Sequence, residues 1–117
     1  MEEGPPPDER FASETKRKVI EQLRAAIAKY QPNRSEYHMQ LAEALRDSGE
    51  LAKALPLYEE VVRREPLSIA GLQKLGIAQR RLGMAKAAEA TLKRAVATGP
   101  GNATSWREYG LAMQAAG

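Results

Sequence analysis

The sequence contains no cysteine and only one histidine, His38. The lack of cysteine excludes disulfide bonds, thiol nucleophiles and thiolate metal sites. A single histidine cannot supply a histidine-based metal site or a Ser-His-Asp triad within one chain. A glycine-rich phosphate loop is also missing, because the segment Gly99-Pro100-Gly101 is typical of a turn. We therefore predict a protein that is not an enzyme and that holds no metal or other cofactor.

Aromatic residues and long apolar runs are also scarce. One phenylalanine, one tryptophan and four tyrosines leave a core that must be built mostly from aliphatic side chains. No stretch approaches the roughly 18 apolar residues that a membrane span requires. The first residues lack the basic segment and apolar run that mark a secretory signal. These absences favour a cytoplasmic protein without a membrane span.

Charge is distributed unevenly along the chain, whose net charge is +3. Residues 1–15 carry a net charge of −4, residues 16–65 a net +2 and residues 66–117 a net +5. A basic second half either favours acidic partners or is a solvated surface. Nucleic acid is disfavoured as a partner, because Lys86, Lys93 and Arg94 form no dense run and no aromatic platform for stacked bases lies among them.

The sequence does contain an internal repeat of 34 residues. Residues 35–66 align with residues 69–100, and Pro32, Pro66 and Pro100 end three successive units at a constant spacing. The matching pairs are Leu41 and Leu75, Ala42 and Gly76, Ala44 and Ala78, Gly49 and Gly83, Ala54 and Ala88, and Val62 and Val96. Self-similarity at such a period is typical of a repeat architecture.

Apolar residues within each unit follow the 3.6-residue period of amphipathic helices. Asn33 or Ser35 is expected to cap the first helix of the first unit, and Gly49 to end it. We predict a disordered acidic leader over residues 1–8, a flanking helix over 9–32, one unit over 33–66, a second over 67–100 and a last helix over 101–117.

This pattern resembles the tetratricopeptide repeat, a helix–turn–helix unit of about 34 residues. The residues that carry the resemblance are His38, Leu41, Ala42, Leu45, Ala54, Tyr58, Val61 and Pro66, then Leu72, Leu75, Gly76, Gln79, Ala88, Leu92, Ala95 and Pro100, and finally Trp106, Tyr109, Gly110 and Met113. The resemblance implies an all-α fold. Antiparallel helical hairpins would stack as a short right-handed α-solenoid of about two full repeats plus flanking helices.

The small residues of the repeat have a packing role in this interpretation. Ala42, Gly76 and Gly110, together with Ala54 and Ala88, should let neighbouring helices approach closely. A bulkier residue at these positions should overpack the contact between helices.

The resemblance also implies a concave groove that is lined by the first helix of each unit. The groove residues would be Met39, Glu43, Arg46, Gln73, Ile77, Arg80, Arg81, Arg107 and Leu111. An apolar stripe flanked by arginines suits a peptide or an amphipathic helix with apolar and acidic residues. The alternative is that Ile77 and Leu111 pack on each other or on further chain.

Some tetratricopeptide domains clamp the C-terminal carboxylate of a chaperone through basic and amide side chains. The corresponding positions here are Met39, Glu43, Lys74, Thr104 and Glu108. A glutamate beside a carboxylate is repulsive, so the sequence disfavours this kind of binding.

The last helix is apolar around much of its circumference, with Arg107 and Glu108 as its only charged residues. Tyr109 and Met113 therefore form a second candidate surface, for self-association or for docking on another subunit. The remaining alternative is that the chain is the repeat region of a larger protein. If the helix packs on the second unit through Trp106, that side chain belongs to the core.

Overall fold

Helices make up most of the chain that the computed structural model describes, namely residues 7–30 and 35–117. These ranges contain no strand. The helices are α1 (Pro7–Tyr30), α2 (Glu36–Asp47), α3 (Leu51–Arg64), α4 (Ile69–Arg81), α5 (Ala85–Thr98) and α6 (Ala103–Ala116).

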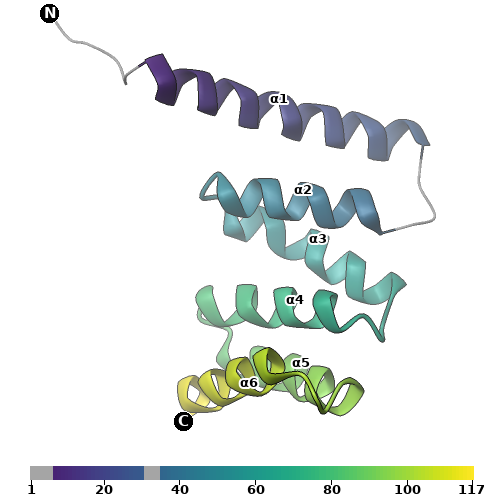
Figure 1. Cartoon of the computed structure of the whole chain (residues 1–117), viewed down its shortest axis with the longest axis vertical. Helices are drawn as coiled ribbons and strands as arrows, with labels where there is room; N and C mark the ends of the chain where they lie inside the picture. Colours follow the sequence, from purple (N-terminus) through teal and green to yellow (C-terminus); the bar gives the residue numbers. More distant parts are fainter. Residues whose placement is uncertain (1–6, 31–34) are drawn as a thin grey trace, which may run out of the picture.

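The helices form hairpins that stack on one another (Figure 1). α2 pairs with α3, and α4 pairs with α5; α1 packs on α2, α3 packs on α4, and α6 packs on both α5 and α4. Each hairpin thus buries its apolar face on its own partner and on the next unit. The prediction of an all-α fold built from stacked helical hairpins is confirmed.

One glycine follows the first helix of each hairpin, Gly49 after α2 and Gly83 after α4, and both have the same conformation. Gly49 has φ 81° and Gly83 has φ 83°, in the left-handed region that favours glycine. The next amide closes the turn in both units: the N–H of Glu50 donates to the Leu45 carbonyl and the N–H of Met84 donates to that of Gln79, each at 2.8 Å. Residues 34 apart in the sequence therefore make the same turn.

The core is largely aliphatic, as the composition predicts. Ala42, Ala54, Leu72, Ala88 and Leu92 are completely buried. Tyr58 is a buried aromatic residue within this core, and the α1 side chain of Ile20 joins it from the first helix.

Gln79 occupies a position where the repeat pattern calls for a large apolar residue, and it is nevertheless buried. The Thr91 hydroxyl of α5 donates a 2.7 Å hydrogen bond to Oε1 of Gln79. Burial of a polar side chain is tolerated when it is hydrogen-bonded, so this bond accounts for the departure from the pattern.

The beginning of α1 and the cap of α2 differ from the sequence-based expectations. α1 starts at Pro7, inside the segment predicted as leader, and proline is well suited to a first helical turn because its missing N–H needs no partner there. Ser35 stands at the N-terminus of α2, but its hydroxyl donates to the Glu65 carboxylate instead of capping the helix. Residues 1–6, the other candidate cap Asn33 and the boundary after residue 32 lie outside the described residues.

The small residues of the repeat do not all have the predicted role. A Cβ on Gly76 would lie 2.4 Å from Cγ of Leu92 on α5, so glycine is required for this close approach. A Cβ on Gly110 would meet no atom of another element within 4 Å in the described part of the chain. The expectation for Gly110 is wrong because no described helix covers that side of α6.

Trp106 is likewise not a core residue. α6 buries Ser105, Glu108 and Ala112, whereas Trp106 is 50% exposed. Its indole Nε1–H donates a 2.7 Å hydrogen bond to the Pro100 carbonyl. The residues at the corresponding position in the first two units, His38 and Leu72, are buried.

We predict opposite effects for alanine at two equivalent glycines. Gly76→Ala should lower the free energy of unfolding by about 1–2 kcal/mol, because overpacking against Leu92 outweighs the gain in helix propensity. Gly110→Ala should raise it by about 0.5–1 kcal/mol, because the site is open and alanine favours the helix. Urea unfolding followed by circular dichroism measures both; equal stability of the two variants would contradict this packing.

We predict that His38 makes stability depend on pH. Burial, helped by the charge of Arg64, lowers the pKa of His38 from its ordinary 6.5. The unfolded chain therefore takes up a proton before the folded one, and the free energy of unfolding falls as the pH drops through 6.5. The matched variant is His38→Leu, since Leu72 occupies the equivalent position. Urea unfolding at about pH 7.5 and 5.5 should show a smaller loss in the variant, and an identical loss would refute the assignment.

Candidate functional site

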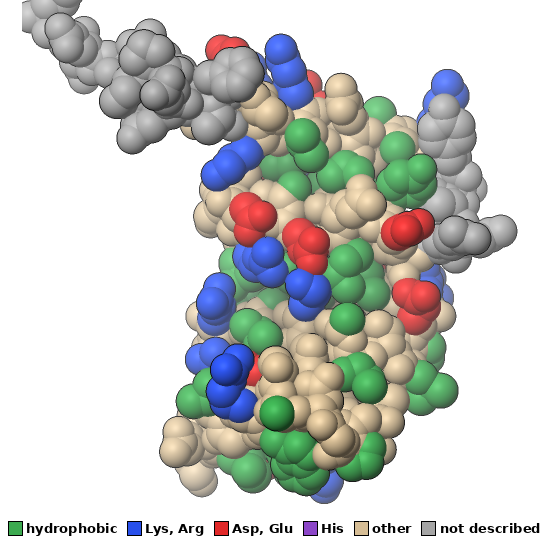
Figure 2. Space-filling view, in the orientation of Figure 1, with side chains coloured by type: hydrophobic (Ala, Val, Ile, Leu, Met, Phe, Trp, Pro, Cys, Tyr) green, Lys and Arg blue, Asp and Glu red, His purple; other side chains and the backbone are tan. Residues whose placement is uncertain are grey.

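The predicted groove residues lie on the first helices of successive units, which side-chain ion pairs connect. Glu43 on α2 pairs with Lys74 on α4 at 2.6 Å. Arg80 on α4 pairs with Glu108 on α6 at 3.4 Å. Figure 2 shows mixed basic and acidic side chains gathered along one side of this face, with apolar side chains beside them. The three helices thus present a continuous, charged surface.

The Glu43–Lys74 pair occupies two of the positions that the carboxylate clamp would use. Both side chains are about one-third exposed, at 34% and 32%. Each neutralises the other, so Lys74 is not a free cation in the groove. A third clamp position holds Glu108, which is already in contact with two arginines.

Arg80 and Arg107 both form ion pairs with the Glu108 carboxylate. Each guanidinium lies 3.4 Å from one of its oxygens, and the Glu108 side chain is only 9% exposed. The pairing from Arg80 crosses from α4 to α6. These two predicted groove arginines therefore pair with a carboxylate of the protein itself, and this carboxylate partly compensates their positive charges.

Gln73 is also engaged within the protein. Its Nε2 donates to Asn102 Oδ1 at 3.0 Å and to Ser105 Oγ at 2.7 Å. Asn102 caps α6 by accepting the backbone N–H of Ser105 at 3.1 Å. Gln73 thus joins α4 to the beginning of α6, a role that the sequence reasoning did not identify.

Arg46, Ile77 and Arg81 are the predicted residues that the structure brings together around one cavity. The cavity has a volume of about 80 Å³ and lies where α2, α3 and α4 meet. Its complete lining is Arg46, Leu51, Tyr58, Lys74, Ile77, Ala78 and Arg81. We call this the Arg46–Arg81 cavity.

Tyr58 and Lys74 line the Arg46–Arg81 cavity but are absent from the predicted groove residues. Tyr58 is 1% exposed, and its hydroxyl has no hydrogen-bond partner among the described residues. The sequence pattern places this residue in the core, and periodicity carries no information on where its hydroxyl points. The sequence signal that could have identified Lys74 as a lining residue is its place next to Gln73, a predicted groove residue.

The predicted apolar stripe does not share one cavity. Ile77 lines the Arg46–Arg81 cavity, whereas Met39 lines a separate hollow of about 390 Å³ with Ser35, Glu36 and Glu65. Leu111 is 40% exposed on α6. The apolar side chains are therefore separate contact points along the surface.

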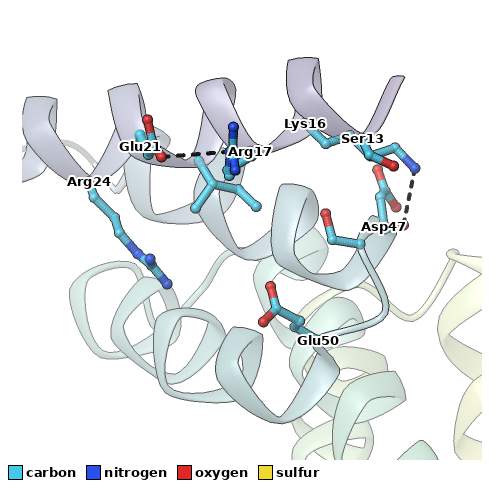
Figure 3. A pocket seen from close by; sticks show the side chains of 9 residues that line it. Ser13, Lys16, Arg17, Glu21, Arg24, Asp47 and Glu50 are labelled. Atoms are coloured by element: carbon cyan, nitrogen blue, oxygen red, sulfur yellow. Dashed lines mark hydrogen bonds and ion pairs between the residues drawn. The ribbon is translucent and has the colours of Figure 1, made fainter. Parts of the chain in front are cut away.

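A larger hollow lies outside the predicted groove, between α1 and the turn that follows α2 (Figure 3). Its volume is about 610 Å³. Its lining includes the bases Lys16, Arg17 and Arg24 and the acid Glu21 from α1, and the acids Asp47 and Glu50 from the other side. Figure 3 shows the Arg17–Glu21 ion pair at 4.0 Å and the bond from Lys16 to the Asp47 carbonyl at 3.5 Å. This balance of charge gives no preference for one ligand class.

The second candidate surface lies on α6. Trp106 and Met113 are 50% and 44% exposed, and the rings of Trp106 and Tyr109 lie 6.3 Å apart. Of the two predicted residues, Met113 is therefore exposed, whereas Tyr109 is half-buried and packs against the buried cluster of Ala88, Leu92 and Ala112.

Residues 7–30 and 35–117 contain no group of three or more histidine, cysteine or acidic side chains arranged to hold a metal ion. No helix within the same ranges has both the length and the apolar character needed to traverse a bilayer.

Comparison with known families decides the classification. Residues 45–112 match one sequence model of the tetratricopeptide repeat, and residues 20–69 match a second. The chain belongs to the tetratricopeptide-repeat family. Repeats of this family generally serve as protein-interaction modules. Among curated proteins, no sequence gave a match.

Several solved structures resemble the chain in fold. MamA 41-end from Desulfovibrio magneticus RS-1 is 19% identical with a TM-score of 0.78, and the match covers 93% of this chain and 61% of that one. The MamA RS-1 ArsTM double mutant is 21% identical with a TM-score of 0.78, at 86% and 56% coverage. This tetratricopeptide-repeat chain therefore spans less than two thirds of both.

A third similar structure is the first tetratricopeptide repeat domain of Spaghetti (RPAP3) bound to the HSP90 peptide SRMEEVD. It is 16% identical to this chain with a TM-score of 0.77, and the match covers 93% of this chain and 86% of that one. At these identities the likeness concerns the fold alone.

We predict that Gln73 contributes to stability. Gln73→Ala should lower the free energy of unfolding by about 1–2 kcal/mol, because Asn102 and Ser105 lose their hydrogen-bond donor. Gln114→Ala, on the exposed side of α6, is the control and should stay within about 0.5 kcal/mol of the wild type. Urea unfolding compares the three proteins. A Gln73 variant as stable as the control would indicate that the hydrogen bonds are replaced by water.

Proposed function

We propose that this tetratricopeptide-repeat chain is a non-catalytic interaction scaffold that binds a segment of a partner protein on the face formed by α2, α4 and α6. The observation that carries this proposal is the convergence of Arg46, Arg81 and Ile77 on one cavity. Guanidinium groups grip carboxylates with two parallel hydrogen bonds, and Ile77 offers an apolar contact beside them.

The chemistry of the partner follows from the charge of this face. Its bases are Arg46, Lys74, Arg80, Arg81 and Arg107, and its acids are Glu36, Glu43, Asp47 and Glu108, which leaves a net charge of +1. Met39, Ile77 and Leu111 add separate apolar contacts. A peptide or an amphipathic helix with acidic residues between apolar anchors complements this arrangement.

Recognition of a C-terminal carboxylate through the clamp positions is not part of this proposal. Glu43 and Glu108 stand at two of those positions, and both are paired within the protein. The HSP90 peptide belongs to the similar structure described above, and the ligand proposed here is an internal acidic and apolar segment.

A second candidate function is docking on another subunit, or on a second copy, through α6. The observation in its favour is the exposure of Trp106 and Met113 beside Tyr109. Aromatic residues and methionine are enriched at the centres of protein interfaces.

Selection from a phage-displayed library of random peptides of about 12 residues tests the proposal. The immobilised wild type should enrich peptides that combine Asp or Glu with Leu, Ile, Met or Phe. Enriched peptides are then synthesised with a fluorophore and titrated by anisotropy. Arg46→Glu with Arg81→Glu should weaken binding tenfold or more, since each reversal places like charges together.

The control double variant is Lys86→Glu with Lys93→Glu on α5, where both side chains are exposed. It makes the same change in net charge away from the groove and should leave the affinity unchanged. Equal loss in both double variants would reduce the effect to net charge and would contradict a groove site. Binding that survives the groove reversals but is lost in Tyr109→Ser with Met113→Ser would favour docking through α6.

A further inference from the structure

The Arg46–Arg81 cavity has the size of a site for one side chain. Its volume of about 80 Å³ exceeds the space that a single water needs. Sites for whole small molecules usually measure about 300 Å³ or more. The cavity lies on the surface, because the side chains of Arg46 and Lys74 are 34% and 32% exposed and Arg81 is exposed.

Tyr58 lines this cavity, and Arg46 lies near its hydroxyl. The residue is 1% exposed, and the hydroxyl oxygen is buried without a partner in the part of the chain that the structure describes. Leaving a buried polar group unpaired is unfavourable. Burial raises the pKa of Tyr58, against the opposing effect of the nearby Arg46, so the hydroxyl keeps its proton and can donate it in a hydrogen bond.

The cations around the cavity are only partly compensated. Arg46 pairs with the neighbouring Asp47 at 3.1 Å, and Lys74 pairs with Glu43 at 2.6 Å. Arg81 forms no ion pair with any residue within the described ranges. Three cations against two anions leave one positive charge, and neither anion lines the cavity itself.

We infer that the Arg46–Arg81 cavity binds one side-chain carboxylate of an acidic residue in the partner segment. The carboxylate would accept hydrogen bonds from the guanidinium groups of Arg46 and Arg81, and from the buried Tyr58 hydroxyl once the neighbouring Arg46 side chain turns toward the ligand. This inference rests on the proposed function, and it names the chemical group that the groove recognises.

The lining favours a side-chain carboxylate over the carboxylate at a chain end. Leu51, Ile77 and Ala78 form apolar walls against which the methylene groups of a glutamate or aspartate can pack. A terminal carboxylate would bring its own backbone N–H into the cavity. The charged groups there, on Arg46, Lys74 and Arg81, are donors only and could not accept a hydrogen bond from that N–H.

The probes are two matched capped amino acids, N-acetylglutamate methylamide and N-acetylglutamine methylamide, which differ only in the side-chain charge. Each is titrated into isotope-labelled wild type, followed by heteronuclear NMR with the Tyr58 ring signals assigned. The glutamate probe should give saturable shifts at the cavity residues in the millimolar range, and the glutamine probe should not. N-acetylnorvaline, with a terminal carboxylate only, should bind at least tenfold more weakly.

Tyr58→Phe removes only the hydroxyl and should weaken binding of the glutamate probe by about tenfold, the effect of losing one hydrogen bond to a charged group. Its unfolding midpoint should not fall, because the hydroxyl has no partner in the free protein. Arg81→Gln, at an exposed position, should weaken the probe as well, while Lys86→Gln on α5 should not. Equal binding of both capped probes, or unchanged affinity in both cavity variants, would overturn the inference.

The outcome separates this inference from the proposed function. If selected peptides lose affinity in the groove reversals but not in Tyr58→Phe, the groove is used and the cavity is not the carboxylate site. If the glutamate probe binds at the cavity and the library yields no peptide, the cavity recognises carboxylates and the proposal of a peptide-binding groove fails.

Discussion

The stack depends on close contacts between small and large side chains where helices meet. Gly76 on α4 receives the Leu92 side chain of α5 in the space that a Cβ would occupy, and Ala42, Ala54 and Ala88 are completely buried. Contacts of this kind set how near packed helices lie and therefore how far apart the predicted groove side chains stand.

Polar contacts determine how the units align once apolar packing has brought them together. The Thr91–Gln79 bond joins the two helices of one hairpin, and Gln73 bridges to Asn102 and Ser105 at the beginning of α6. Apolar surfaces alone tolerate sliding, whereas a buried hydrogen bond is lost when the partners shift. Hydrogen bonds within the protein thus explain why glutamine stands at position 79, where the repeat pattern suggests a core residue, and at position 73, where it suggests a ligand contact.

Much of the fold could be predicted from the sequence, because it depends on local signals that recur at a fixed spacing. The turns at Gly49 and Gly83 are an example, since positive φ favours glycine regardless of the surroundings. Trp106 and Gly110 could not be predicted in this way: the pattern tells which face of a helix packs, and it does not tell whether another helix lies there.

The site was less predictable still. The choice of partners among Arg80, Arg107 and Glu108 depends on distances between helices. Likewise, the unpaired hydroxyl of Tyr58 is a feature of three helices together.

The ion pairs between successive first helices have a mechanical consequence. Glu43–Lys74 and Arg80–Glu108 tie α2 to α4 and α4 to α6, and so add to the helix packing that already joins these neighbouring units. Dissolved ions screen the more exposed Glu43–Lys74 pair more than the Arg80–Glu108 pair, whose carboxylate is buried. Added salt is therefore expected to weaken the connection between the first and second hairpins more than the connection between α4 and α6.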